Sequence, residues 1–264
     1  MRLLFLLLGL ALVVVGCGVK TESNTPPALK PERFEYAEAG RCDTLTNRGV
    51  TIKANYVLLQ DGTEAAEAIN ADLRNRIMSS LTSWLDSTAV AANPQARSDL
   101  QAAARLFAAD YRELTKELGP IGGCWELTVK SDTVYTSPRT ITVRLDSYAY
   151  TGGAHPNSYT AFYNFDRQTG RNLSIRDLVS DTTALLPLVE KAFRQKQDIR
   201  PEQDLEAEGY FLEDGRFFLP ENVGISRDGL VFYYNPYEIG AYALGPIDVL
   251  VPYAQLEDIL TLQR

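Results

Sequence analysis

The sequence has few of the residues on which most hydrolases and metal sites depend. Its 264 residues include one histidine, His155, and three cysteines. Histidine is the usual general base and metal ligand near neutral pH. Neither an H-E-x-x-H helix nor a C-x-x-C pair occurs. We therefore expect no metal site, no cofactor and no catalytic residue, and we predict that the protein is not an enzyme.

Long apolar runs are also absent after the N-terminus. Arg2 precedes a nearly unbroken apolar stretch, residues 3–15, and Gly16 separates this stretch from Cys17. The stretch is shorter than the roughly 18 residues that a membrane span needs, and small residues before a cysteine are typical of a lipoprotein signal. We predict that residues 1–16 are a signal peptide and that Cys17 carries the lipid. The alternative is an uncleaved anchor helix.

This anchor predicts a location in the cell envelope. The residue after the lipid cysteine is Gly18, where an aspartate would act as a retention signal, so the outer membrane is favoured if the cell has two membranes. The formal net charge is −8. A chain this acidic repels phosphate backbones and anionic lipid surfaces, so we expect no nucleic-acid partner.

Two cysteines remain if Cys17 is lipidated. Cys42 and Cys124 would then lie together in an oxidising compartment, where a disulfide is favoured. Closing a loop of about 80 residues would stabilise the fold by roughly 4 kcal/mol in the chain-entropy model. Two buried free thiols are the alternative.

Proline and polar residues set the predicted domain organisation. Residues 17–33 contain three prolines and no hydrophobic period, which predicts a flexible tether after the lipidated cysteine. We expect an N-terminal α+β domain at 34–132 and a C-terminal α+β domain at 138–264, with the turn-rich segment 133–138 between them.

The N-terminal domain is predicted to be a strand-helix-helix-strand unit. Residues 50–58 alternate as a half-buried strand does. Thr63 is a predicted N-cap for a helix that runs to Trp84 or Leu85, and Asn93 with Pro94 is predicted to open a second helix that closes at Gly119. Apolar and polar residues alternate again at 125–129, which predicts the second strand of the unit.

The C-terminal domain is predicted to be mainly an antiparallel sheet with one or two packed helices. Residues 141–145 and 159–165 alternate and suggest two strands joined by a loop. Ser174 is a predicted cap for a short helix, and a longer helix covers 185–196. Asp228-Gly229 predicts a hairpin, 247–251 a last strand and 253–262 a last helix.

The loop between those two strands is the strongest candidate for a binding site. Adjacent glycines, a histidine and an asparagine occur together where backbone shape is tightly specified. A second candidate segment supplies tyrosines of the kind found in interfaces and sugar-stacking surfaces. The candidate residues are Gly152, Gly153, His155, Asn157, Tyr159, Tyr237, Glu238 and Tyr242. A plain turn, with His155 packed on its neighbours, is the alternative.

Two further motifs match only in part. Residues 224–228 begin as G-x-S-x-G but end in aspartate, which disfavours a nucleophile elbow. Asp204, Glu206 and Glu208 resemble the first half of an EF-hand loop, but the twelfth position is Gly215 where a glutamate is needed. A solvated acidic loop is favoured over a calcium site.

Several segments together resemble a known family. Residues 150–155 (YTGGAH), 164–166 (NFD), 228–234 (DGLVFYY) and 236–239 (PYEI) are similar to the domain of unknown function that ends the anti-sigma factor RsiV. The likeness covers roughly residues 138–258. Residues 34–130 look like the smaller domain that precedes the catalytic domain in PdaC-type peptidoglycan deacetylases.

The resemblance implies an extracytoplasmic α+β module that, in RsiV, binds lysozyme. The sequence has no stretch resembling a sigma-binding segment or a deacetylase domain, so we expect neither activity. We therefore expect a non-catalytic envelope protein that binds a lysozyme-like protein or a cell-wall glycan. A hydrolase that acts on wall or ester substrates through His155, and a purely structural protein, are the alternatives.

Overall fold

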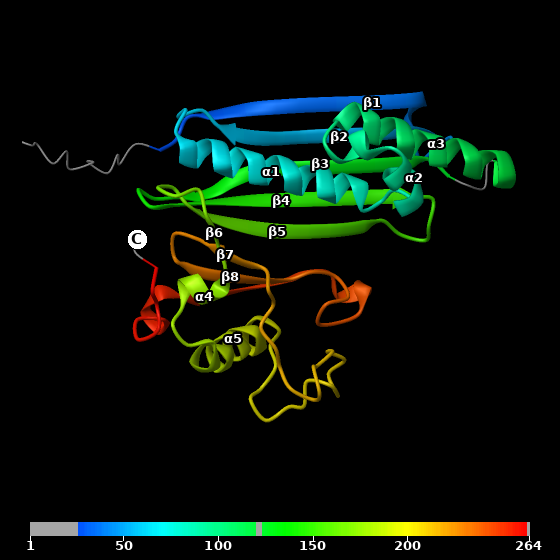
Figure 1. The fold of residues 1–264 in the computed structure, drawn as a ribbon. Coiled ribbons are helices and arrows are strands. Elements are labelled where there is room, and N and C mark those ends of the chain that lie inside the picture. The colour runs from blue at the N-terminus through cyan, green and yellow to red at the C-terminus, as the bar shows by residue number, and fades with distance from the viewer. Residues whose placement is uncertain (1–25, 120–122, 263–264) are drawn as a thin grey trace, which may run out of the picture.

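The fold is α+β, as predicted, with two sheets and helices on each. A computed structural model describes residues 26–119 and 123–262. The predicted signal peptide 1–16, the lipid site Cys17 and most of the predicted tether lie outside the described residues. A six-stranded sheet with helices forms the N-terminal part, and a separate three-stranded sheet with a helix forms the C-terminal part (Figure 1).

The larger sheet follows the chain order from β1 to β6. Neighbouring strands are antiparallel except β2 and β3, which are parallel. A parallel pair needs a long crossover, and residues 60–124 supply it. The strands are β1 (Leu29–Asp43), β2 (Arg48–Leu59), β3 (Trp125–Thr136), β4 (Thr140–Thr151), β5 (Asn157–Asp166) and β6 (Asn172–Leu173).

The crossover is helical and covers one face of the larger sheet (Figure 1). It consists of α1 (Glu64–Thr82), α2 (Ser87–Ala92), the 3-10 turn η1 (Pro94–Arg97) and α3 (Leu100–Leu118). Thr63 caps α1 as predicted, because its hydroxyl accepts a hydrogen bond from the Ala66 N–H. Apolar residues of α1 and α3 pack on Val50, Ile52 and Leu127 of the sheet. Burial of this face stabilises the layer.

The predicted start of the second long helix is wrong. Asn93 closes α2, since its side-chain amide donates to the Ala89 carbonyl, and Pro94 begins only the short turn η1. The long helix α3 begins at Leu100, where the Asp99 carboxylate caps the Gln101 N–H. Its predicted end at Gly119 is confirmed, with φ +64° at that glycine. Helix α1 also ends earlier than predicted, at Thr82, so Trp84 lies beyond it.

Strand pairing also reaches into segments that sequence patterns left irregular. Strand β1 begins at Leu29, within the predicted tether, and pairs with β2 as an edge strand that tolerates Pro31. Strand β3 extends to Thr136, so the predicted break at 133–138 falls at the turn between β3 and β4. These two strands pair in one sheet, which therefore continues past that segment.

The C-terminal part has its own apolar core. The hairpin at Asp228-Gly229 is confirmed: β7 (Val223–Ile225) pairs with β8 (Gly229–Tyr234), which pairs with β9 (Ile247–Pro252). Ser174 caps α4 (Ile175–Leu178) in a capping box, and α5 (Thr182–Lys196) packs against β9. Phe193, Phe232 and Tyr234 are fully buried in this core.

The predicted helix at 253–262 is wrong beyond its first residues. Only the 3-10 turn η4 (Tyr253–Gln255) forms there. A similar short turn, η3 (Tyr242–Leu244), precedes β9. Leu260 forms an antiparallel bridge with Val179, and the Thr261 N–H donates to the Leu178 carbonyl. Pairing with this distant segment satisfies the backbone groups that a helix would have paired locally.

Asparagine side chains join the two parts along strand β5. The Asn222 amide accepts from the Phe162 N–H at 2.8 Å and donates to the Thr160 carbonyl at 2.7 Å. The Asn235 amide pairs with both backbone groups of Thr160 in the same way. Asn164 completes the row by binding the Val223 carbonyl and the Ile225 N–H. These amides close an edge that would otherwise expose unpaired backbone groups.

A disulfide connects Cys42 with Cys124, which confirms the predicted pairing. The two residues are 82 positions apart, and their Cα atoms are 4.9 Å apart. The bond joins the end of β1 to the start of β3 across the helical crossover. Among the described helices, none has the length and apolar character needed to cross a membrane.

Candidate functional site

Three aromatic rings from two distant loops meet at one end of the molecule. The His155 ring stacks on the Tyr242 ring with centroids 3.9 Å apart, and the Tyr237 hydroxyl lies 3.3 Å from Nε2 of His155. The Tyr242 hydroxyl donates to the Pro156 carbonyl at 2.8 Å. We call His155, Tyr237 and Tyr242 the aromatic cluster. The structure thus brings together three of the predicted site residues.

A tight turn presents Tyr237 to solvent. The Glu238 N–H donates to the Asn235 carbonyl, and the Glu238 carboxylate accepts from the Asn235 N–H at 2.8 Å. Tyr237 lies between them with φ +70°, a left-handed conformation that is strained for a residue other than glycine. Its side chain is 55% exposed. The turn therefore holds a large aromatic ring at the surface at a conformational cost.

Burial raises the pKa of Glu238 above its ordinary value of 4.5. The hydrogen bond from Asn235 opposes this shift, and the nearby Glu221 carboxylate adds to it. Glu238 was predicted as a binding residue, and the structure places it as the residue that closes the turn carrying Tyr237.

Two exposed apolar side chains lie on loops next to the aromatic cluster. Phe211 is 47% exposed, and its N–H donates to the Ile239 carbonyl. Leu244 is 48% exposed and would contact any Cβ added to Gly240. We call Phe211 and Leu244 the apolar rim. Both adjoin the segment 237–242 that carries two rings of the aromatic cluster, and contiguous exposed apolar area is typical of interaction surfaces.

The segment on either side of Phe211, residues 202–214, is acidic, and we call it the acidic loop. Four carboxylates precede Phe211 in residues 202–208, and two more follow in residues 213–214. Within the described residues, no cluster of three or more histidine, cysteine or acidic side chains has the geometry to hold a metal ion. The acidic loop therefore contributes negative charge beside the rim.

The remaining predicted site residues are not part of the aromatic cluster. Gly152 adopts φ +82°, and a Cβ added to Gly123 would come within 2.9 Å of the Gly152 Cα, so the lack of a side chain at Gly123 permits a close backbone crossing. Gly153 and Asn157 are exposed near the start of β5. Tyr159 lies on the helix-covered face of the sheet, opposite Ser147 of β4.

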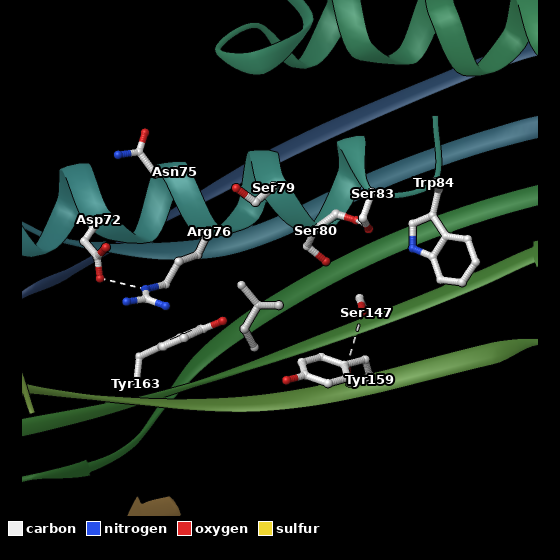
Figure 2. A pocket seen from close by; sticks show the side chains of 11 residues that line it. Asp72, Asn75, Arg76, Ser79, Ser80, Ser83, Trp84, Ser147, Tyr159 and Tyr163 are labelled. Carbon is white, nitrogen blue, oxygen red and sulfur yellow. Dashed lines mark hydrogen bonds and ion pairs between the residues drawn. The ribbon is translucent and has the colours of Figure 1, made fainter. Parts of the chain in front are cut away.

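Tyr159 lines a groove between α1 and the strands β4 and β5 (Figure 2). The hollow has a volume of about 610 Å³. Helix α1 contributes serines on this side, and Trp84 closes one end. A second hollow of about 560 Å³ shares Arg76, Tyr159 and Tyr163 with the first and continues past Ser174 and Arg176. We call the two together the α1–β5 groove.

Arg76 is held rigidly in the middle of the α1–β5 groove. Its Nε atom donates to the Asp72 carboxylate at 2.7 Å, one helical turn earlier. Its guanidinium carbon lies 3.9 Å from the centre of the Tyr163 ring, which is a cation–π contact. Pairing with Asp72 neutralises the charge of this arginine locally.

The hydrogen bonds of His155 indicate its tautomer. Nδ1 lies 3.0 Å from the Pro156 carbonyl, which only accepts, so Nδ1 carries the proton in the neutral ring. Nε2 then accepts from the Tyr237 hydroxyl. In the described part of the chain, the groups that hydrogen bond to His155 are this carbonyl and this phenol. Neither is a carboxylate of the kind that orients a catalytic histidine.

Sequence reasoning did not identify the α1–β5 groove. Its walls come from residues 72–84, 145–176 and 221–223, which no local pattern connects. Trp84 was assigned to the apolar stripe of a helix. The only signal was the run of short hydroxyl side chains Ser79, Ser80 and Ser83, which leave space on a helix face.

Two family models match the chain in the predicted order. Residues 46–158 match the family described as deacetylase PdaC, and residues 176–254 match a protein family of unknown function, DUF3298. The peptidoglycan-N-acetylmuramic acid deacetylase PdaC of Bacillus subtilis is 26% identical over 138 residues, which are 51% of this chain and 29% of that protein. The immunogenic protein MPT64 of Mycobacterium tuberculosis is 28% identical over 147 residues, which are 52% of this chain and 60% of that protein. The chain spans less than two thirds of either relative.

Solved structures agree with the fold over most of the chain. A DUF3298 family member from Bacteroides fragilis superposes with a TM-score of 0.66 at 22% identity, covering 89% of this chain and 95% of the other. A DUF3298 family protein from Pseudomonas aeruginosa superposes with a TM-score of 0.62 at 16% identity, covering 90% and 96%. Both are similar in fold across the two parts of the molecule.

Proposed function

We propose that this chain, with its PdaC-type match followed by its DUF3298 match, is a non-catalytic binding protein of the cell envelope. The aromatic cluster and the apolar rim form its binding surface, and its ligand is a basic protein of the lysozyme type. The observation that carries this proposal is the strained, exposed Tyr237 held against His155. Strain that persists at an exposed aromatic residue is typical of functional sites.

The chemistry of this surface fits a protein partner. Exposed tyrosines dominate binding energy in interfaces, because they bury a large area at a small entropic cost. Tyr237, Phe211 and Leu244 supply such area on neighbouring loops. The acidic loop and the net charge of −8 favour encounter with a basic protein.

The location is part of the same proposal. Lipid attached to Cys17 would hold the folded residues outside the cytoplasm, and the Cys42–Cys124 disulfide is consistent with an oxidising compartment. Mass spectrometry of the native protein tests the anchor. An acylated N-terminal Cys17 is the expected result, and a product that keeps residues 1–16 without acyl groups would exclude it.

Titration calorimetry with hen lysozyme tests the binding surface. We expect Tyr237→Ala to weaken binding by about 2 kcal/mol, the loss typical of an interface hot spot, and His155→Ala to weaken it in the same direction. Tyr159→Ala is the matched control, since Tyr159 is equally exposed at 52% but lies in the α1–β5 groove. No binding heat, or equal losses in Tyr159→Ala and Tyr237→Ala, would reject the proposal.

Two other functions predict different results with the same variants. A hydrolase centred on His155 predicts turnover of wall or ester substrates that disappears in His155→Ala. A purely structural role predicts that His155→Ala and Tyr237→Ala lower the melting temperature and leave every ligand unaffected.

A further inference from the structure

We infer that the α1–β5 groove is a second binding site, separate from the aromatic cluster, and that its ligand is an uncharged oligosaccharide. None of the eleven residues lining the first hollow belongs to the aromatic cluster or the apolar rim. This site therefore does not depend on the proposed protein-binding surface.

The groove exists because short side chains face each other across it. Helix α1 packs its apolar residues Ile69 and Leu73 against Ile141 and Phe165 near one end of the sheet. Ser79 and Ser80 in the last turn of α1, and Ser83 just after it, line the hollow together with Ser147 of β4 (Figure 2). Serine side chains do not fill the space between a helix and a sheet, so a hollow of about 610 Å³ remains.

Aromatic platforms line this hollow. Trp84 closes one end, and Tyr159 and Tyr163 lie along β5 below the helix (Figure 2). The Arg76 guanidinium covers the Tyr163 ring, so Trp84 and Tyr159 are the platforms that a sugar ring can reach. Flat aromatic faces stack on the C–H faces of sugars because both surfaces are apolar.

The polar lining suits the hydroxyl groups of a sugar. Ser79 and Ser80 offer hydroxyls in the first hollow. The Ser83 hydroxyl donates to the Ser80 carbonyl and the Ser174 hydroxyl donates to Asp177, so these two are left to accept hydrogen bonds from a ligand. Arg76 presents a planar guanidinium between the two hollows, already oriented by Asp72 and Tyr163. Groups fixed in this way lose little entropy when they bind.

The charge of the lining argues for an uncharged ligand. Its acidic groups are Asp72 and Glu221, and its basic groups are Arg76 and Arg176, so the lining is neutral overall. A nucleic acid would require an excess of basic residues. A lipid chain would require a lining without the serines, amides and charged side chains that the two hollows contain. An oligosaccharide fits this lining, because it is uncharged, carries hydroxyl groups for the polar side chains and has flat apolar faces for the aromatic rings. Each hollow also lies within the range of roughly 300–1,000 Å³ that is usual for ligand pockets.

Titration of the protein with chitohexaose and with cellohexaose tests the inference. We expect at least one of them to bind, and Tyr159→Ala and Trp84→Ala each to weaken that binding about tenfold, the loss of one aromatic stacking contact. Ser80→Trp should block binding because it fills the hollow. Tyr237→Ala is the control and should bind the sugar as the wild type does.

Backbone amide chemical shifts of the wild-type protein make the test independent of any variant's folding. Sugar-induced shifts confined to residues 72–84 and 157–164 would support the inference. Failure of both sugars to bind, or shifts centred on the aromatic cluster, would overturn it. Lysozyme binding that is unchanged in Trp84→Ala separates this result from the proposed protein-binding function.

Discussion

The side-chain amide of Asn222 pairs with the backbone beside Phe162 as a neighbouring strand would. It accepts from the Phe162 N–H at 2.8 Å and donates to the Thr160 carbonyl at 2.7 Å. Strand β6 covers only two residues of β5, so the rest of that edge depends on side chains from the C-terminal part. A single amide thus supplies the donor and the acceptor that an edge strand needs.

Asn222→Ala should lower the free energy of unfolding by about 2–3 kcal/mol, because it leaves two backbone groups at the interface without partners. Urea unfolding followed by circular dichroism measures the change. Asn157→Ala, at an exposed position of the same strand, should change stability by no more than about 0.5 kcal/mol. Equal effects of the two substitutions would contradict the role given to Asn222.

Tyr237→Gly and Tyr237→Ala should differ in stability although both remove the ring. Glycine adopts φ +70° without strain, whereas alanine does not, so the glycine variant should be more stable by about 1 kcal/mol. Thermal unfolding of the two variants measures this difference. Both variants should lose lysozyme binding, which a role in stability alone would not explain.

Reduction of the Cys42–Cys124 disulfide should lower the free energy of unfolding by about 4 kcal/mol, since the bond closes a long loop in the unfolded chain. Chemical denaturation with and without dithiothreitol measures the loss. A Cys42→Ser, Cys124→Ser variant should match the reduced protein and should not respond to the reductant. A response in that variant would mean that the reductant acts elsewhere.

Glu238→Gln should stabilise the protein increasingly as the pH rises. The raised pKa means that the folded protein holds this proton more tightly than the unfolded chain, so wild-type stability falls as the pH rises from about 4.5 through the folded-state pKa. Glutamine keeps an oxygen to accept from the Asn235 N–H. The difference in unfolding free energy between variant and wild type should therefore be larger at pH 7 than at pH 4. A constant difference would contradict burial of the charged form.

Local patterns predicted the elements whose signals are local. The hairpin at Asp228-Gly229, the Thr63 cap and the helix end at Gly119 were found because each depends on residues that are neighbours in sequence. The Cys42–Cys124 pairing was found by elimination. The meeting of the loop at His155 with the segment at Tyr237 was suggested only by their unusual composition.

Elements that depend on distant partners were missed. Strand β1 is polar and contains Pro31, and only pairing with β2 makes it a strand. Residues 256–262 have a helical pattern, but Leu260 pairs with Val179 instead. The α1–β5 groove and the asparagine row along β5 join residues about 60 or more positions apart, so neither leaves a periodic signal.

The parallel pairing of β2 and β3 also predicts an order of assembly. Strands β3 to β5 form a meander in which neighbouring strands are also neighbours in sequence. In contrast, Val50 and Ile52 of β2 pair with Trp125 and Leu127 of β3, which follow a long helical connection. Loop closure over such a connection is entropically unfavourable, and non-local pairing is slow. While the chain is being made, the first hairpin therefore remains without its inner neighbour until the next strand has emerged, and during that interval its apolar side is open to association with other chains.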